Sequence, residues 1–220
     1  MYPYILFDLD GTLTDPGEGI TNSVAYALEQ FGIRVPDRKA LYPFIGPPLL
    51  DSFAKYYGMK KEDCQRALYE YRVYFRAKGI LENALYPKTV WLLQQLRATG
   101  RHLVLATSKP EEFAEQILAH FDLRQYFDCV AGASMDETRS KKSDVIAYAL
   151  QKAGVTEISE AVMVGDRRHD VEGAKANGMP TIGVLWGYGD EAELREAGAA
   201  AICRDMEELA SILLKTEGDV

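Results

Sequence analysis

Residues 5–15, with the sequence ILFDLDGTLTD, decide the fold of the chain. The segment starts with an apolar run, as in a strand covered on both faces of a sheet, and Asp8 and Asp10 follow at once. Side chains two residues apart on a strand share a face, so both carboxylates can point to one site. Two carboxylates this close repel each other unless a cation lies beside them, and Mg²⁺ prefers oxygen ligands. The segment therefore predicts a buried strand with a charged, metal-binding end.

The rest of the chain alternates short apolar runs with helical patterns. Apolar residues at helical spacing precede Gly100 and again Gly154, and each glycine is typical of a helix end. Strand–helix alternation predicts a parallel sheet with right-handed crossovers, that is, an α/β, Rossmann-like core. The expected strands are residues 4–7, 102–106, 129–131, 161–164 and 181–185.

The first expected strand is followed by a long insertion. The next strand begins near residue 102, much further along than the dozen or so residues that a crossover needs. Apolar stripes at helical spacing run from Ile20 to Phe31 and from Leu68 to Phe75, with a Gly-Pro-Pro turn between them. We therefore expect a small α-helical cap domain, residues 16–83, inserted into a core domain of residues 1–15 and 84–220.

The composition limits the classes of function. Among 220 residues, 47% are hydrophobic and 26% charged, and the net charge of −8 argues against nonspecific binding to nucleic acid or to an anionic membrane. Cys64, Cys129 and Cys203 are too far apart for a disulfide framework or a metal-ligand cluster. No apolar run approaches the ~18 residues of a membrane span. We expect a cytoplasmic protein without nucleic-acid or membrane partners; the sequence indicates no oligomeric state.

Three further segments bring polar groups to the ends of expected strands or helices. Thr107 and Ser108 follow the second strand and offer hydroxyls and backbone amides just before a helix start. Lys142 precedes another helix, and Asp166 and Asp170 follow the fourth strand. Ligands of open parallel sheets bind beyond the carboxyl ends of the strands, so we expect these segments to converge on one site with the two N-terminal aspartates.

These four segments, in this order, resemble the motifs of the haloacid dehalogenase-like (HAD) hydrolases: a DxDGT loop, a strand-end Thr or Ser, a lysine and a GDxxxD loop. The resemblance covers essentially the whole chain. It implies that Asp8 is a nucleophile that forms an aspartyl-phosphate, and that Asp10 acts first as general acid and then as general base. It also implies a Mg²⁺ site made of Asp8, the backbone carbonyl of Asp10, Asp166 and Asp170.

The resemblance further assigns the substrate-binding residues. Thr107 and Lys142 would bind the phosphoryl oxygens and neutralise charge in the transition state, and Ser108 would contribute mainly its backbone. Chemistry alone does not separate Lys142 from its neighbour Lys141, and the motif spacing of the family favours Lys142. The dehalogenases of the family lack a counterpart of Asp10, so its presence favours phosphoryl chemistry.

Four segments together narrow the branch of the family: FIGPPL at residues 44–49, TSKP at residues 107–110, GDRRHDVEGAKANG at residues 165–178 and GVLWGYG at residues 183–189. The combination resembles bacterial 5′-nucleotidase-like and phosphoglycolate phosphatase-like members with a helical cap. Residues 165–167 and 44–49 favour the nucleotidase-like group. We therefore expect hydrolysis of a small phosphorylated metabolite, a nucleoside monophosphate first and phosphoglycolate second. The alternatives are a sugar phosphomutase of the same fold, a phosphonate hydrolase with a cap lysine, and a noncatalytic binding protein. For Asp15, a helix-capping or hinge role is favoured over catalysis.

Overall fold

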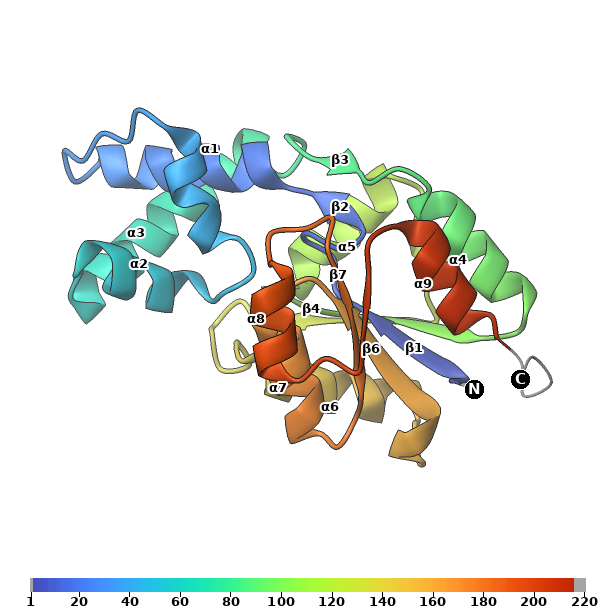
Figure 1. The fold of residues 1–220 in the computed structure, drawn as a ribbon. Helices are drawn as coiled ribbons and strands as arrows, with labels where there is room; N and C mark the ends of the chain where they lie inside the picture. Colours follow the sequence, from blue (N-terminus) through green and yellow to red (C-terminus); the bar gives the residue numbers. More distant parts are fainter. Residues whose placement is uncertain (1, 216–220) are drawn as a thin grey trace. The chain divides into compact units, whose positions relative to one another are not determined.

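The computed structural model describes residues 2–215, and the chain divides into two compact units (Figure 1). One unit combines residues 1–14 with residues 85–220, and the other is residues 15–84. Each unit has its own secondary structure and its own buried side chains. No helix within residues 2–215 combines the length and the apolar character that crossing a membrane requires.

The larger unit is built on a parallel sheet with the strand order β5-β4-β1-β6-β7-β8. β1 lies in the middle, where Leu6 pairs with Val104 of β4 on one side and with Met163 of β6 on the other. The chain continues outward through β4 and β5 in one direction and through β6, β7 and β8 in the other, so the strand order reverses at β1 (Figure 1). A ligand site is expected beyond the carboxyl end of β1. The strands are β1 Tyr4–Phe7, β4 His102–Pro110, β5 Cys129–Ala133, β6 Ala161–Gly165, β7 Thr181–Val184 and β8 Ala201–Cys203.

The expected α/β fold class and its five parallel strands are confirmed, although four of the strands end at other residues than expected and the sheet has one further strand. β4 continues past the expected end at residue 106, to Pro110. β8 was not predicted, because three residues of modest apolar character do not make a recognisable strand pattern. β8 forms because its backbone pairs with β7, Ile182 opposite Ala201 and Val184 opposite Cys203.

Helices cover both faces of the sheet, which explains why its strands are continuously apolar. α4 and α9 lie on one side and α6 and α7 on the other (Figure 1). Val145 and Ile146 of α6 belong to one buried cluster with Leu6, Val104 and Met163 of the strands. The helices are α4 Thr89–Ala98, α5 Glu111–His120, α6 Lys142–Ala153, α7 Arg168–Ala176, α8 Glu191–Ala197 and α9 Met206–Leu213, with 3-10 turns at Arg124–Tyr126 and Ile158–Glu160.

Residues 15–84 form a helical unit in which α1 packs against α3. The N-terminal part of α1 crosses a π-helical turn so closely that a Cβ on Gly19 would lie 2.0 Å from the carbonyl oxygen of Gly79. Asp15 Oδ1 accepts a hydrogen bond from the N–H of Gly17 at the start of α1 (3.0 Å). The elements are α1 Gly17–Glu29, α2 Leu49–Tyr57, α3 Lys61–Tyr74, a 3-10 segment Arg38–Phe44 and the π-helical turn Phe75–Gly79. The short strands β2 Thr14–Asp15 and β3 Ala84–Leu85, where the chain passes from one unit to the other, pair with each other.

Candidate active site

The DLDGT segment forms a closed loop directly after β1. The carbonyl oxygen of Leu9 accepts hydrogen bonds from the N–H groups of Leu13 (2.9 Å) and Thr14 (3.0 Å). The N–H of Gly11 donates back to the carbonyl of Thr14 (2.8 Å), and Gly11 has a φ of 85°, in the region that favours glycine. These local bonds fix the backbone that carries Asp8 and the other aspartate of the motif.

Three buried carboxylates meet at the carboxyl edge of the sheet. Asp8 follows β1, Asp166 follows β6 and Asp170 lies in the first turn of α7, and each offers a carboxylate oxygen within 4.8 Å of the others. Lys142, at the start of α6, places its Nζ 2.7 Å from Asp8 Oδ1 and 2.6 Å from Asp170 Oδ1. The structure thus brings together residues from three of the four motif segments.

The charges of this cluster do not balance. Burial raises the pKa of Asp170 to about 6, with Lys142 opposing the shift and Asp8 adding to it. Burial likewise raises the pKa of Asp166 well above its ordinary value, and the neighbouring Asp170 and Asp8 raise it further. Burial alone would lower the pKa of Lys142, but the carboxylates of Asp170 and Asp8 more than offset it and raise the pKa. With all three carboxyl groups ionised, one ammonium among them leaves an excess of negative charge, and this repulsion is what raises the pKa values beyond the effect of burial.

The residues of the cluster fit a divalent cation. Asp166 Oδ1 is buried and has no hydrogen-bond partner among residues 2–215, although buried polar atoms are normally paired. Carboxylate oxygens are the ligands that Mg²⁺ prefers, and a cation beside them would relieve their repulsion. The carboxylate of Asp10 is not one of the three; its expected ligand is its backbone carbonyl, which stays a prediction.

Asp10 contacts a second buried lysine, which sequence reasoning missed. Lys109 Nζ lies 2.8 Å from Asp10 Oδ2, and both residues are 7% exposed. Burial raises the pKa of Asp10, an effect that Lys109 opposes without cancelling. A signal was present in the sequence: Lys109 lies two residues after Thr107, and on a strand that spacing places both side chains on one face.

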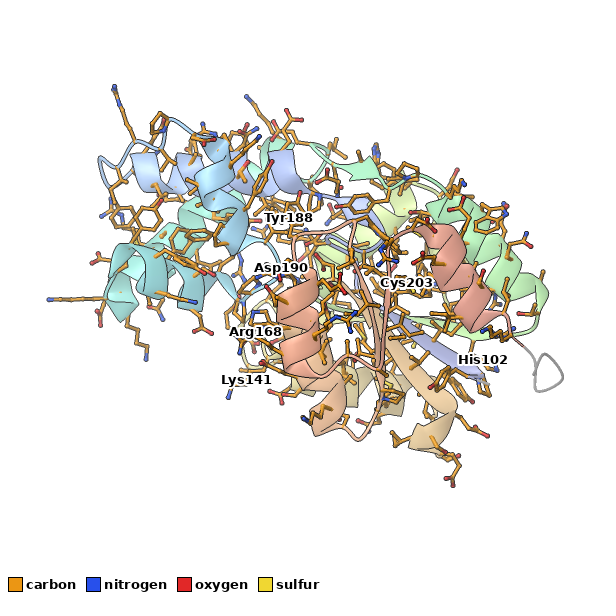
Figure 2. All side chains as sticks on the ribbon, in the orientation of Figure 1. His102, Lys141, Arg168, Tyr188, Asp190 and Cys203 are labelled. Carbon is orange, nitrogen blue, oxygen red and sulfur yellow. The ribbon has the colours of Figure 1, made fainter. Side chains whose placement is uncertain are left out.

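Thr107 and Ser108, the remaining predicted site residues, directly precede Lys109 in the chain. Thr107 is buried at the carboxyl end of β4, where its Oγ1 accepts a hydrogen bond from the N–H of Lys109 (3.2 Å), and Ser108 is partly exposed. Lys141, the neighbour of Lys142, is exposed at the start of α6 (Figure 2). Contact of Thr107 and Ser108 with a phosphoryl group stays a prediction.

A segment beyond β7 also reaches the site, and sequence reasoning did not assign it a role there. Tyr188 follows β7 and precedes α8 in the chain, and it is labelled in Figure 2; its backbone N–H donates to Asp166 Oδ2 (2.7 Å). The indole Nε1 of Trp186 donates to the carbonyl oxygen of Thr12 (2.9 Å). The sequence signal was that this segment directly follows the carboxyl end of an expected strand, where ligands of parallel sheets bind.

Comparison with known proteins points in the same direction. A family model described as haloacid dehalogenase-like hydrolase matches residues 5–184. The chain is 43% identical over 212 residues to a 5′-nucleotidase of Pseudomonas aeruginosa, covering 96% of each protein. It is also 43% identical over 186 residues to tyrosine-protein kinase PtkA of Mycobacterium tuberculosis, covering 84% of this chain and 62% of that protein. A crystal structure described as a predicted phosphatase from Clostridium acetobutylicum is 48% identical, with a TM-score of 0.96 and coverage of 98% of this chain and 100% of the other.

The chain therefore belongs to the haloacid dehalogenase-like hydrolases. Within that family it is an enzyme of the phosphatase class. The expected family and the expected class of enzyme are both confirmed.

Proposed function

We propose that the protein is a Mg²⁺-dependent phosphomonoester hydrolase that acts through an aspartyl-phosphate on Asp8. The observation that carries the proposal is the buried contact of Lys142 with both Asp8 and Asp170 beside Asp166. A carboxylate nucleophile next to a fixed cation, at the carboxyl edge of a parallel sheet, is arranged to attack a bound phosphoryl group.

In the first step Asp8 attacks phosphorus, the new bond forms to its carboxylate oxygen, and the bond from phosphorus to the ester oxygen breaks. Lys142 assists this step, because its ammonium orients Asp8 through Oδ1 and can also neutralise charge on the phosphoryl oxygens. Thr107 would bind the phosphoryl group through its hydroxyl. When bound by Asp8, the carbonyl of Asp10, Asp166 and Asp170, Mg²⁺ would supply positive charge that offsets the repulsion between phosphate and carboxylates.

In this proposal Asp10 is first the proton donor and then the proton acceptor. A raised pKa suits a carboxylic acid that protonates the leaving alcohol oxygen, because the group must hold its proton until the ester bond breaks. The resulting carboxylate then takes a proton from the water that attacks the aspartyl-phosphate, which releases inorganic phosphate and restores Asp8. Lys109 holds one oxygen of Asp10, and Asp10 Oδ1 has no hydrogen-bond partner among the residues described.

A nucleoside monophosphate is the proposed substrate. Support comes from the similarity to a 5′-nucleotidase that extends over 96% of both chains. We further propose that residues 16–83 act as a cap domain that contributes to substrate selection. Its aromatic cluster, in which the ring of Phe44 contacts those of Phe53, Tyr56 and Tyr57, offers flat side chains of the kind that stack on a nucleobase, and Tyr56 is 43% exposed.

A phosphate-release screen of the purified chain tests the proposal. The panel comprises nucleoside monophosphates, phosphoglycolate, sugar phosphates and p-nitrophenyl phosphate, each with Mg²⁺ and with a chelator. We expect Mg²⁺-dependent release, fastest from a nucleoside monophosphate, and no release by Asp8→Asn with its melting temperature retained. Turnover by that variant would contradict the nucleophile assignment, and a clear preference for phosphoglycolate would contradict the substrate. Isomerised sugar phosphate without inorganic phosphate would indicate a mutase.

A further inference from the structure

The segment between β7 and α8 makes hydrogen bonds to two different parts of the site. The backbone N–H of Tyr188 binds Asp166 Oδ2 at 2.7 Å, and the indole N–H of Trp186 binds the carbonyl oxygen of Thr12 at 2.9 Å. Thr12 belongs to the closed loop that follows the Asp8 nucleophile. One short segment therefore holds a carboxylate of the acid cluster and the backbone of the nucleophile loop.

Glycines let this segment approach so closely. A Cβ on Gly187 would lie 2.3 Å from Asp166 Oδ2 and 2.3 Å from the carbonyl oxygen of Gly11. A Cβ on Gly11 would lie 2.1 Å from the same Asp166 oxygen, and one on Gly189 would lie 2.0 Å from the carbonyl oxygen of Asp166. Real Cβ atoms do not come this near to other heavy atoms. The carboxylate of Asp166 therefore occupies space that side chains at positions 11 and 187 would fill, and its backbone carbonyl occupies space that a side chain at position 189 would fill.

The two oxygens of Asp166 are consequently not equivalent. Oδ2 is packed beside two glycines and bonded to the N–H of Tyr188, whereas Oδ1 is buried without a hydrogen-bond partner in the part of the chain that is described. A carboxylate fixed through one oxygen loses little further freedom when the other oxygen binds a cation. Residues that orient metal ligands in this way affect metal affinity by about 10–100-fold when they are changed.

We propose that residues 186–189 are a positioning element that holds Asp166 with Oδ1 ready to bind Mg²⁺ and, through Trp186, ties that carboxylate to the nucleophile loop. This role rests on the proposed function, since it concerns the metal of the phosphatase site. In this proposal Trp186 acts through its hydrogen bond to Thr12 rather than on the substrate. Its hydrogen bond fixes the position of Asp166 relative to Asp8. These two residues follow different strands, and in the proposed site both bind the same cation.

Paired tryptophan variants of the full chain test the proposal. The chain has two tryptophans, and Trp91 lies on α4, 38% exposed. Trp186→Phe keeps an aromatic ring but loses the N–H donor, and Trp91→Phe is the matched control. By calorimetric titration we expect Mg²⁺ affinity to fall about tenfold in Trp186→Phe and to stay within about twofold of wild type in Trp91→Phe. Substrate KM measured at saturating Mg²⁺ should stay nearly unchanged in both.

Tryptophan fluorescence measures the same link between Trp186 and the metal site without substrate turnover. In Trp91→Phe the remaining tryptophan is Trp186, and we expect its emission to shift when Mg²⁺ is added. The shift should disappear when Asp166→Asn is added to that variant. Gly187→Ala, which places a Cβ against Asp166 and the Gly11 carbonyl, should weaken Mg²⁺ binding more than Trp186→Phe does; if it does not fold, the tryptophan pair decides.

The outcomes separate the two proposals. Wild-type phosphatase activity and Mg²⁺ binding together with unchanged Mg²⁺ affinity in Trp186→Phe would overturn the positioning role and leave the proposed function standing. Equal losses in Trp186→Phe and Trp91→Phe would also overturn it, because they would show a general effect of losing an indole. A wild-type chain that neither binds Mg²⁺ nor releases phosphate would overturn both.

Discussion

Lys141 and Lys142 carry the same side chain at adjacent positions, yet their environments are opposite. Lys141 is exposed, whereas Lys142 is buried between Asp8 and Asp170. The start of α6 causes the difference, because Lys141 is the N-cap residue with an extended backbone, whereas Lys142 is the first residue of the helix. A buried ammonium also avoids the large cost of unpaired burial only when carboxylates surround it. The buried ammonium of Lys142 and the buried carboxylates of Asp8 and Asp170 therefore stabilise one another.

This contrast defines a paired test of the cluster. Lys142→Met removes the cation that contacts the nucleophile, and we expect kcat to fall about 10²–10³-fold, as for loss of one charge-stabilising donor. Lys141→Met, the matched control, should change kcat less than about twofold, as expected for a solvated charge. Steady-state phosphate release measures both. Comparable losses in the two variants would contradict the assignment of Lys142.

Lys109 allows a test of proton donation at the residue scale. Its ammonium holds Asp10 Oδ2, so Lys109→Met should leave that carboxylate wrongly oriented for the leaving oxygen. The proposal that Asp10 is the general acid then predicts a substrate-dependent loss: about 10²-fold on alkyl phosphates, whose leaving groups need a proton, and much less on p-nitrophenyl phosphate, whose leaving group does not. The second substrate serves as an internal control. Equal losses on both would indicate general damage to the site.

At the scale of elements, glycine lowers the stability of a helix interior but permits close packing where two helical segments cross. An alanine normally stabilises a helix interior relative to glycine, by about 1 kcal/mol. In α1, however, Gly19 lies so close to the carbonyl of Gly79 that a Cβ would be 2.0 Å from its oxygen. The contact lies within residues 15–84, so its disruption tests how that unit is packed.

We therefore expect Gly19→Ala to destabilise the chain by about 1–3 kcal/mol, the cost of overpacking a well-packed contact, against the helix propensity. Thermal unfolding followed by circular dichroism measures the effect. Glu29→Ala changes an exposed position of the same helix and should shift the melting temperature little. Stabilisation by Gly19→Ala would contradict the close crossing of α1 and the π-helical turn.

On the scale of the whole molecule, the acid cluster makes stability depend on pH and on metal. In the folded, metal-free chain the pKa of Asp170 is raised from 3.8 to about 6, and burial raises the pKa of Asp166 and Asp10 as well. Between these values the folded state binds protons that the unfolded state has released. The free energy of unfolding should therefore decrease as pH rises from about 4 to above 6.

The loss for the whole cluster should be on the order of a few kcal/mol, since raising a pKa by one corresponds to about 1.4 kcal/mol. Chemical denaturation with a chelator should thus show a more stable protein at pH 5 than at pH 7.5. Saturating Mg²⁺ should restore stability at pH 7.5, because a ligand that binds only the folded state stabilises it. Asp170→Asn should show a weaker pH dependence. Stability that rises with pH in the chelated wild type would contradict the buried acid cluster.

The sequence by itself determined the α/β fold, the five strands that position the site and the family to which the chain belongs. These features are local or periodic: apolar runs define buried strands, and polar residues just beyond them must lie at one sheet edge when the strands are parallel. The spacing of the motifs also favoured Lys142 over its neighbour, in agreement with its burial, although its catalytic role stays a prediction.

Only the tertiary structure decided which of these residues contact one another. The pairing of Lys109 with Asp10, and the bond from Trp186 to Thr12, join segments that no periodicity relates. β8 likewise depends on pairing with β7 rather than on its own sequence. Such contacts follow from the strand order and from the close approach that glycines at 11 and 187 permit, so they exist only once the chain has folded around its central strand.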